Sequence, residues 1–143
     1  MKKLLYFILL VVGLIMGTAN AAEYEEGQVW KYKTRNSEEN SLLYIVKIDE
    51  EKGYGKIYHI YVDGLKIKNP HISGGIQEQL PHTPVDVKTL NESVTQLVEN
   101  KKNMPDISEG YKNWREPFDK GEAGVFNIPV NKIIQYIEDA INR

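Results

Sequence analysis

Three histidines offer the most versatile chemistry in this 143-residue chain, because an imidazole can transfer protons near neutral pH and can bind metal ions. His59, His71 and His82 all lie between Lys56 and Asp86. Zinc-binding motifs bring two histidines close together in the sequence, as in H-E-x-x-H, whereas these three are dispersed. The spacing therefore predicts separate hydrogen-bonding roles, with no metal and no other cofactor. A metal site built from His59, His71 and His82 with nearby carboxylates is the weaker alternative.

Catalytic nucleophiles have little support in the sequence. No serine lies in a G-x-S-x-G motif. The absence of cysteine excludes thiol chemistry, iron–sulfur clusters and cysteine-based zinc sites. Ser73 comes nearest to a functional serine, because the two glycines that follow it could offer backbone amides to an anion. Glycine pairs more often mark turns, so Ser73 is predicted at the tip of a flexible loop.

Three β-strands are predicted around the first histidine. The segments 27–34 (GQVWKYKT), 41–49 (SLLYIVKID) and 56–62 (KIYHIYV) are rich in β-formers and have alternating side chains. The turn signals RNSEEN and EEKGYG separate them, so the three strands are expected to form an antiparallel meander. The segment 65–69 continues in an extended conformation, which allows a fourth strand.

A loop and then a helix are predicted to follow the strands. Glycines and prolines between Pro70 and Pro84 indicate the loop. Asp86 is a good N-cap for a helix over residues 87–101. The apolar stripe of this helix has helical spacing and consists of Val87, Leu90, Val94, Leu97 and Val98.

The C-terminal part is predicted to hold two more helices. One begins near Ser108 and breaks near Pro117, and after the short strand 123–128 (AGVFNI) the last helix has Pro129 at its first position. The element order predicts an α+β fold, an antiparallel β-meander of three or four strands with about three helices packed on one face. Residues 22–143 have the length of a single domain.

The alternation assigns the strand side chains to two faces of the sheet. The face toward the helices is predicted to hold Trp30, Tyr32, Leu42, Tyr44, Val46, Ile48, Tyr58, Ile60 and Val62. The opposite face is predicted to hold Lys31, Lys33, Leu43, Ile45, Lys47, His59 and Tyr61. Mixed aromatic, aliphatic and basic groups of this kind are typical of surfaces that contact other proteins. This face is either open to a partner or covered by the loop or a helix.

The N-terminus has the pattern of a cleavable signal peptide. Lys2 and Lys3 precede the apolar run Leu4 to Met16, and A-x-A follows at residues 19–21. The run is shorter than the about 20 residues that a membrane-spanning helix needs. We therefore expect cleavage after Ala21, a periplasmic or secreted location, and no stable membrane anchor after cleavage.

The charge of the chain argues against nucleic acid as a partner. The net charge is −2 before the signal peptide is removed, and loss of its two lysines makes the remaining chain more acidic. Nucleic-acid binding depends on many lysines and arginines that neutralise phosphates. The remaining lysines lie among carboxylates and are typical of a solvated surface.

Three strings of the sequence resemble a small uncharacterised family of exported bacterial proteins. They are GQVWKYKTR, HIYVDGLKIKNP and LPHTPVDVKTLNESVTQLV, and the resemblance covers residues 27 to about 98. It implies export. It implies no activity and assigns no catalytic residue.

The sequence thus favours an exported binding protein over an enzyme. Such a protein, for example an inhibitor or an immunity-type protein, would act by protein–protein contact with a partner in the cell envelope. Its candidate contact residues are Lys31, Lys33, Lys47, His59, Tyr61, His71, Ser73 and His82. The alternative is a small envelope enzyme or metal-dependent protein that uses His59, His71 and His82, and a small-molecule site under the loop 70–84 is also open.

Overall fold

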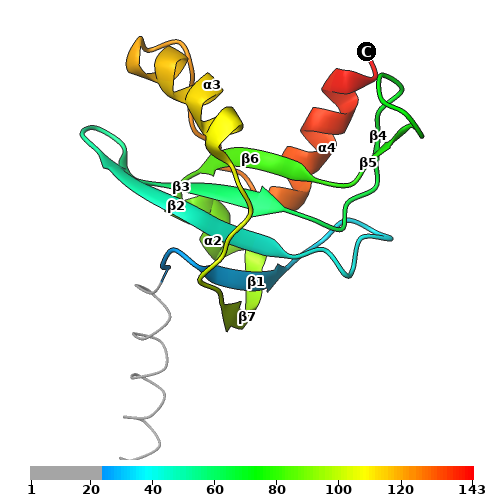
Figure 1. The fold of residues 1–143 in the computed structure, drawn as a ribbon, viewed down its shortest axis with the longest axis horizontal. Coiled ribbons are helices and arrows are strands. Elements are labelled where there is room, and N and C mark those ends of the chain that lie inside the picture. The colour runs from blue at the N-terminus through cyan, green and yellow to red at the C-terminus, as the bar shows by residue number, and fades with distance from the viewer. Residues whose placement is uncertain (1–23) are drawn as a thin grey trace, which may run out of the picture.

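The fold combines an antiparallel sheet with helices. The computed structural model describes residues 24–143, so the signal peptide predicted at residues 1–21 lies outside the described part. The described chain forms a five-stranded sheet, a two-stranded ribbon and three helices (Figure 1). The predicted α+β class is confirmed, with five strands in the main sheet instead of three or four. Among residues 24–143, no helix combines the length and the apolar character needed to cross a membrane.

The main sheet has the strand order β6-β3-β2-β1-β7, and all of its pairs are antiparallel. Its strands are β1 (Gln28–Tyr32), β2 (Leu43–Glu51), β3 (Gly55–Val62), β6 (Leu80–Val85) and β7 (Val94–Asn100). The small ribbon consists of β4 (Ile67–Lys68) and β5 (Ile76–Gln77), and it lies beside the C-terminal helix (Figure 1). The predicted meander corresponds to β1, β2 and β3.

The first helix is shorter than predicted. Asp86 caps α2 (Val87–Ser93) as expected, since its carboxylate accepts a hydrogen bond of 3.1 Å from the backbone nitrogen of Thr89. The helix then ends, and residues 94–100, predicted as its second half, form strand β7 instead. Valine and threonine are β-branched and favour strands, and pairing with β1 outweighs the helical spacing of the apolar residues.

The last two helices agree more closely with the prediction. Helix α3 (Ser108–Asp119) contains Pro117 in its last turn and ends two residues later. Helix α4 (Val130–Ile141) follows Pro129, which is the N-cap rather than the first helical residue. The strand predicted at residues 123–128 is reduced to one bridge, between Val85 and Phe126.

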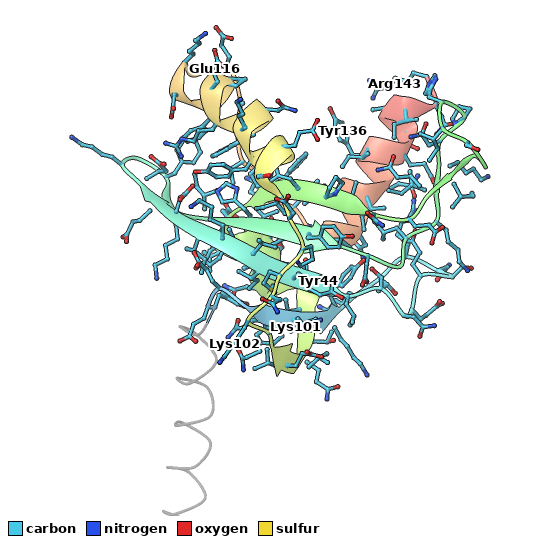
Figure 2. The ribbon with its side chains drawn as sticks, in the orientation of Figure 1. Tyr44, Lys101, Lys102, Glu116, Tyr136 and Arg143 are labelled. Carbon is cyan, nitrogen blue, oxygen red and sulfur yellow. The ribbon has the colours of Figure 1, made fainter. Side chains whose placement is uncertain are left out.

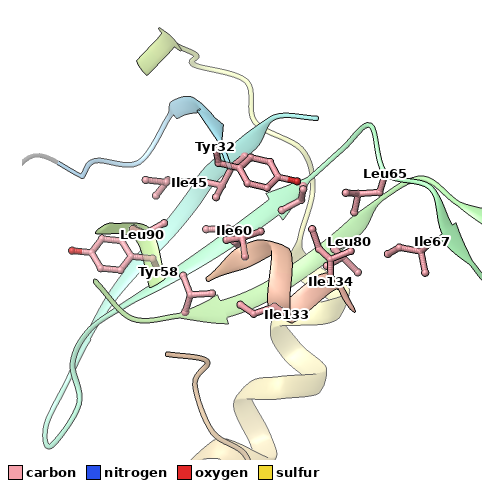
Figure 3. Packing of buried hydrophobic residues seen from close by; sticks show 14 residues of the cluster. Tyr32, Ile45, Tyr58, Ile60, Leu65, Ile67, Leu80, Leu90, Ile133 and Ile134 are labelled. Carbon is pink, nitrogen blue, oxygen red and sulfur yellow. The ribbon is translucent and has the colours of Figure 1, made fainter. Parts of the chain in front are cut away.

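The helices are divided between the two faces of the main sheet. One face forms the core with α2 and α4, where Leu90, Ile133 and Ile134 pack with strand residues (Figure 3). Helix α3 lies on the other face, where its Tyr111 and Trp114 rings contact His59. The strand residues of the core cluster include Tyr32, Leu43, Ile45, Tyr58, Ile60, Val62, Leu80 and Val85.

A β-bulge in β2 changes the predicted assignment of its faces. Leu43 and Ile45, predicted on the face opposite the core, are fully buried in the core. Ile45 pairs with Ile60 and Lys47 pairs with His59, so Val46 is an extra residue between the two pairs. One extra residue reverses the alternation. The assignment by strict alternation was therefore wrong for the first half of β2.

A buried ionic network fastens α4 to the turn after β1. Glu38 is 2% exposed and accepts hydrogen bonds of 2.9 and 2.7 Å from the guanidinium of Arg35. The same guanidinium reaches Glu138 of α4 at 3.1 Å. The backbone nitrogen of Lys66 also donates to Glu38, at 2.7 Å. The Glu38 carboxylate thus joins this turn to the segment at Lys66, and the Arg35 guanidinium joins it to α4.

Candidate functional site

Two of the three histidines lie in contact beneath α3. Nδ1 of His59 is 2.9 Å from Nε2 of His82, and the two rings are stacked with their centroids 5.2 Å apart. The pairing of β3 with β6 brings them together. His59 lies opposite Pro84, so His82, two residues from Pro84, is the diagonal neighbour of His59 on the same face. No sequence pattern indicated this contact, because it depends on the strand register.

Asp49 determines which ring nitrogens of the histidine pair donate and which accept hydrogen bonds. Its Oδ2 atom is 3.1 Å from Nε2 of His59 and accepts a hydrogen bond of 2.7 Å from the Tyr111 hydroxyl. An ionised carboxylate only accepts, so Nε2 of His59 carries a hydrogen. Nδ1 of a neutral His59 then accepts from Nε2–H of His82. The result is a hydrogen-bonded chain from His82 through His59 to Asp49.

The surroundings hold both imidazoles neutral. Burial lowers the pKa of His59 from the usual 6.5, and the neighbouring Asp49 only partly opposes this effect. Burial, with His59 as a second cause, lowers the pKa of His82 to about 4. Burial alone would raise the pKa of Asp49, but the hydrogen bond from Tyr111 and the His59 imidazole leave it below its usual value. At neutral pH the hydrogen-bonded group of His82, His59 and Asp49 therefore has one charge, on Asp49.

Helix α3 covers these hydrogen-bonded residues and holds them with aromatic and ionic contacts. The ring centroids of Tyr111 and Trp114 lie 4.8 and 4.9 Å from that of His59, both in edge-on geometry. Arg115 forms ion pairs with Glu51 and, at 3.5 Å, with Asp49. These contacts hold α3 on the sheet and leave His59 with no exposed surface.

The geometry of this histidine site limits its chemistry. Nδ1 of His82 has no hydrogen-bond partner among the described residues. Every buried side-chain nitrogen and oxygen of these residues does have a partner, so Nδ1 of His82 is not buried and reaches solvent. It can accept a proton there. Across residues 24–143 no three histidines or carboxylates are arranged to hold a metal ion. His71 lies elsewhere, with Nε2 3.4 Å from the carbonyl oxygen of Ile141 in α4, so the three histidines do not form one site.

The predicted contact residues are divided between covered and open surface. Lys47 lies near the histidine pair, with Nζ 5.2 Å from the centre of the Tyr111 ring. Tyr61 packs edge-on against Tyr44, 5.6 Å between centroids, beyond the area that α3 covers. The remaining predicted contact residues that are exposed are Lys31, Lys33, His71 and Ser73. The predicted face is thus only partly open, because α3 covers its His59 end.

One surface that sequence reasoning missed is the outer edge of β7. This strand ends the main sheet and pairs with β1 alone (Figure 1). Leu97 and Val98 are large aliphatic residues, yet they are 40% and 41% exposed. Sequence reasoning missed this edge because it predicted a helix over residues 87–101. The signal that could have revealed it is the β-branched residues Val94, Thr95 and Val98, which favour a strand.

The opposite edge of the sheet is protected. Strand β6 contains Pro81 and Pro84, which have no N–H to offer a further strand. The chain near Phe126 also covers it, since Phe126 donates to the Pro84 carbonyl at 2.9 Å and accepts from the Asp86 nitrogen at 3.0 Å. Of the two edges, β7 is therefore the one that can accept another strand.

Comparison of the chain with protein-family models, with curated proteins and with solved structures found no match. The resemblance to exported bacterial proteins stays a prediction. Function is therefore argued from the geometry of the histidine site and of the β7 edge.

Proposed function

We propose that the protein is an exported binding protein, periplasmic or secreted, that takes up an extended segment of a partner polypeptide at β7. The proposal keeps the function class that the sequence favours, protein–protein contact of an inhibitor or immunity type. It moves the main contact from the lysine and histidine face to the sheet edge. The observation that supports it is the unprotected edge of β7 with its exposed Leu97 and Val98.

Strand addition explains why such an edge would bind protein. An edge strand has main-chain N–H and C=O groups that no neighbour pairs, and an extended peptide can satisfy them by extending the sheet. Main-chain hydrogen bonds then supply affinity and the side chains supply selectivity. Exported proteins usually protect such edges, as β6 does here with its two prolines. An edge left open while the other is protected is expected where binding takes place.

The test is a screen of the mature chain, residues 22–143, against a library of short random peptides. Amide hydrogen exchange of the complex with each selected peptide then locates the binding site. We expect slower exchange at residues 94–100 and loss of binding in Leu97→Lys. The matched control is Ile72→Lys, since Ile72 is 42% exposed but lies between β4 and β5. Protection confined to another part of the chain, or no selected peptide, would contradict the proposal.

The hydrogen-bonded chain from Asp49 to His82 favours one second candidate, a small envelope enzyme. In that function Nδ1 of His82 would act as a general base and His59 would position it. His71 has no part in it, since it lies between β4 and β5, beside the last residue of α4. The test is a screen with ester, phosphate-ester and glycoside substrates. Turnover that is lost in His82→Gln and kept in His71→Gln would support an enzyme, and an absence of turnover would oppose it.

A further inference from the structure

We propose that the partner segment is apolar in its middle and acidic at both ends. This inference rests on the proposed function, strand addition at β7, and adds the chemistry of the partner. It follows from the position of four lysines, two at each end of β7. They are Lys31, Lys33, Lys101 and Lys102.

The backbone fixes where these lysines lie. At the start of β7, the Lys33 nitrogen donates to the carbonyl of Ser93, the residue before the strand, at 2.9 Å. Lys31 of β1 lies opposite Gln96, the third residue of β7, and so beside the first half of the strand. At the other end, Lys101 and Lys102 directly follow the strand (Figure 2). The Lys101 nitrogen donates to the Gly27 carbonyl at 2.7 Å, which keeps this end beside β1. The edge is therefore flanked by positive charge on both sides.

These lysines are free to bind an acidic partner. All four are exposed, and none forms an ion pair with a described residue. Within β7 itself the charged residue is Glu99. The whole chain has a net charge of −2, so this edge is basic on a protein that is acidic overall. Opposite charge on the partner gives selectivity and a faster encounter.

The length of the strand separates the two basic ends. Because of its two register shifts, β7 lies along the five residues of β1, which span about 17 Å at about 3.3 Å per residue. Salt screens exposed charges beyond about 8 Å at physiological ionic strength. Each pair of lysines therefore attracts separate carboxylates, and one acidic cluster in the partner could not lie close to both pairs. The partner needs acidic residues at the two ends of the strand that it adds.

The middle of the edge favours aliphatic contacts. Two register shifts in the pairing with β1 leave Gln96 and Leu97 in regular register between them. Leu97 lies opposite Trp30, and Val98 is the extra residue of one shift. Both aliphatic side chains are exposed, so a partner residue with an apolar side chain can bury area against them.

The same charges argue against a second copy of this chain as the occupant. If two β7 strands paired in the antiparallel direction, Lys101 and Lys102 of one copy would meet Lys31 and Lys33 of the other. Parallel pairing would bring identical lysines together. Like charges disfavour both arrangements. An acidic segment from a different protein meets no such repulsion.

The test uses three synthetic peptides with one central sequence of alternating valine and threonine. Their two ends have paired glutamates, paired glutamines or paired lysines. Fluorescence anisotropy with the mature chain is expected to give about tenfold tighter binding of the glutamate peptide than of the glutamine peptide, an advantage that added salt removes. The lysine peptide should bind most weakly. The variant Lys31→Gln/Lys33→Gln/Lys101→Gln/Lys102→Gln should remove this preference.

The matched control is Lys112→Gln/Lys132→Gln, which neutralises exposed lysines on α3 and α4 and should leave the preference unchanged. Equal binding of all three peptides, with protection of the β7 amides, would overturn the acidic partner and leave strand addition standing. Failure of every peptide to bind would overturn both. A dimer of the mature chain that Leu97→Lys dissociates would identify a second copy as the occupant and overturn the inference.

Discussion

His59 and His82, from neighbouring strands, share a hydrogen bond of 2.9 Å between Nδ1 and Nε2, and Asp49 accepts from the other nitrogen of His59. The pair lies between the sheet and α3, where Tyr111 and Trp114 pack against it. Because both imidazoles are held neutral, their protonation is coupled to the stability of this part of the fold. The contact of α3 with the sheet is therefore expected to depend on pH.

The first prediction is that acid weakens the protein through His82. Its pKa is about 4 in the folded state, against the usual 6.5 of an imidazole in the unfolded chain, so the unfolded chain binds more protons between these values. The contribution of His82 to stability is complete above about pH 6.5 and is lost as the pH falls toward 4. Urea unfolding as a function of pH should show a smaller loss of stability for His82→Gln. His71→Gln is the control and should follow the wild type.

The second prediction concerns the hydroxyl of Tyr111. Its hydrogen bond of 2.7 Å to Asp49 joins α3 to β2. Tyr111→Phe keeps the ring packed on His59 but removes a bond to a charged group, at a cost of about 2 kcal/mol in the free energy of unfolding. Tyr136→Phe is the matched control, because Tyr136 is 54% exposed. Equal stability of the two variants in urea would contradict the role assigned to Tyr111.

The third prediction tests the close packing of α3 on His82. A Cβ atom at Gly110 would lie 2.6 Å from Cβ of His82, whereas one at Gly124 would have no atom within 4 Å. Alanine favours a helix over glycine by about 1 kcal/mol. Overpacking at Gly110 is expected to exceed this gain and to destabilise Gly110→Ala by about 1 to 2 kcal/mol. Thermal unfolding followed by circular dichroism measures the change.

Two further variants complete this test. Gly124→Ala should leave stability nearly unchanged, because its surroundings are open. Adding His82→Gly to Gly110→Ala should cost less than the sum of the two single changes, since glycine removes the Cβ atom of residue 82 and with it the closest contact. Strict additivity would show that Gly110 and His82 do not touch in solution.

The sequence predicted those parts of the fold that local rules determine. The Asp86 cap, the strands β1 to β3 and the last two helices follow from side-chain type and spacing within one segment. The bulge at Val46 and the strand pairing of β7 do not, because a partner strand imposes them on residues that also fit other patterns. Val94, Leu97 and Val98 have helical spacing, yet they belong to a strand edge.

The candidate site shows the same limit. The sequence drew attention to the histidines as residue types, but it could not show that His59 and His82 touch while His71 lies apart. That outcome depends on the pairing of β3 with β6 and on the position of α3, which lies on the sheet face opposite the core. Asp49 and Tyr111 were missed because they come from different elements, and no local motif joins them.

The last prediction concerns the buried ionic network at Arg35. Removal of its guanidinium in Arg35→Ala would leave Glu38, 2% exposed, without the cation that balances its charge. The backbone nitrogen of Lys66 still donates to Glu38, so part of the solvation of the carboxylate remains. We expect a loss on the order of 3 kcal/mol in the free energy of unfolding.

Lys88→Ala is the control for Arg35→Ala, because Lys88 forms an exposed ion pair with Glu92 within α2, at 2.8 Å. Exposed pairs of this kind contribute about 0.5 kcal/mol or less. Urea unfolding should therefore separate the two variants by about 2 kcal/mol or more. The double variant Arg35→Ala/Glu38→Gln should recover part of the loss, since a neutral amide needs no counter-ion. If Glu38→Gln made the loss larger instead, the cost at Arg35 would come from lost packing rather than from an uncompensated charge.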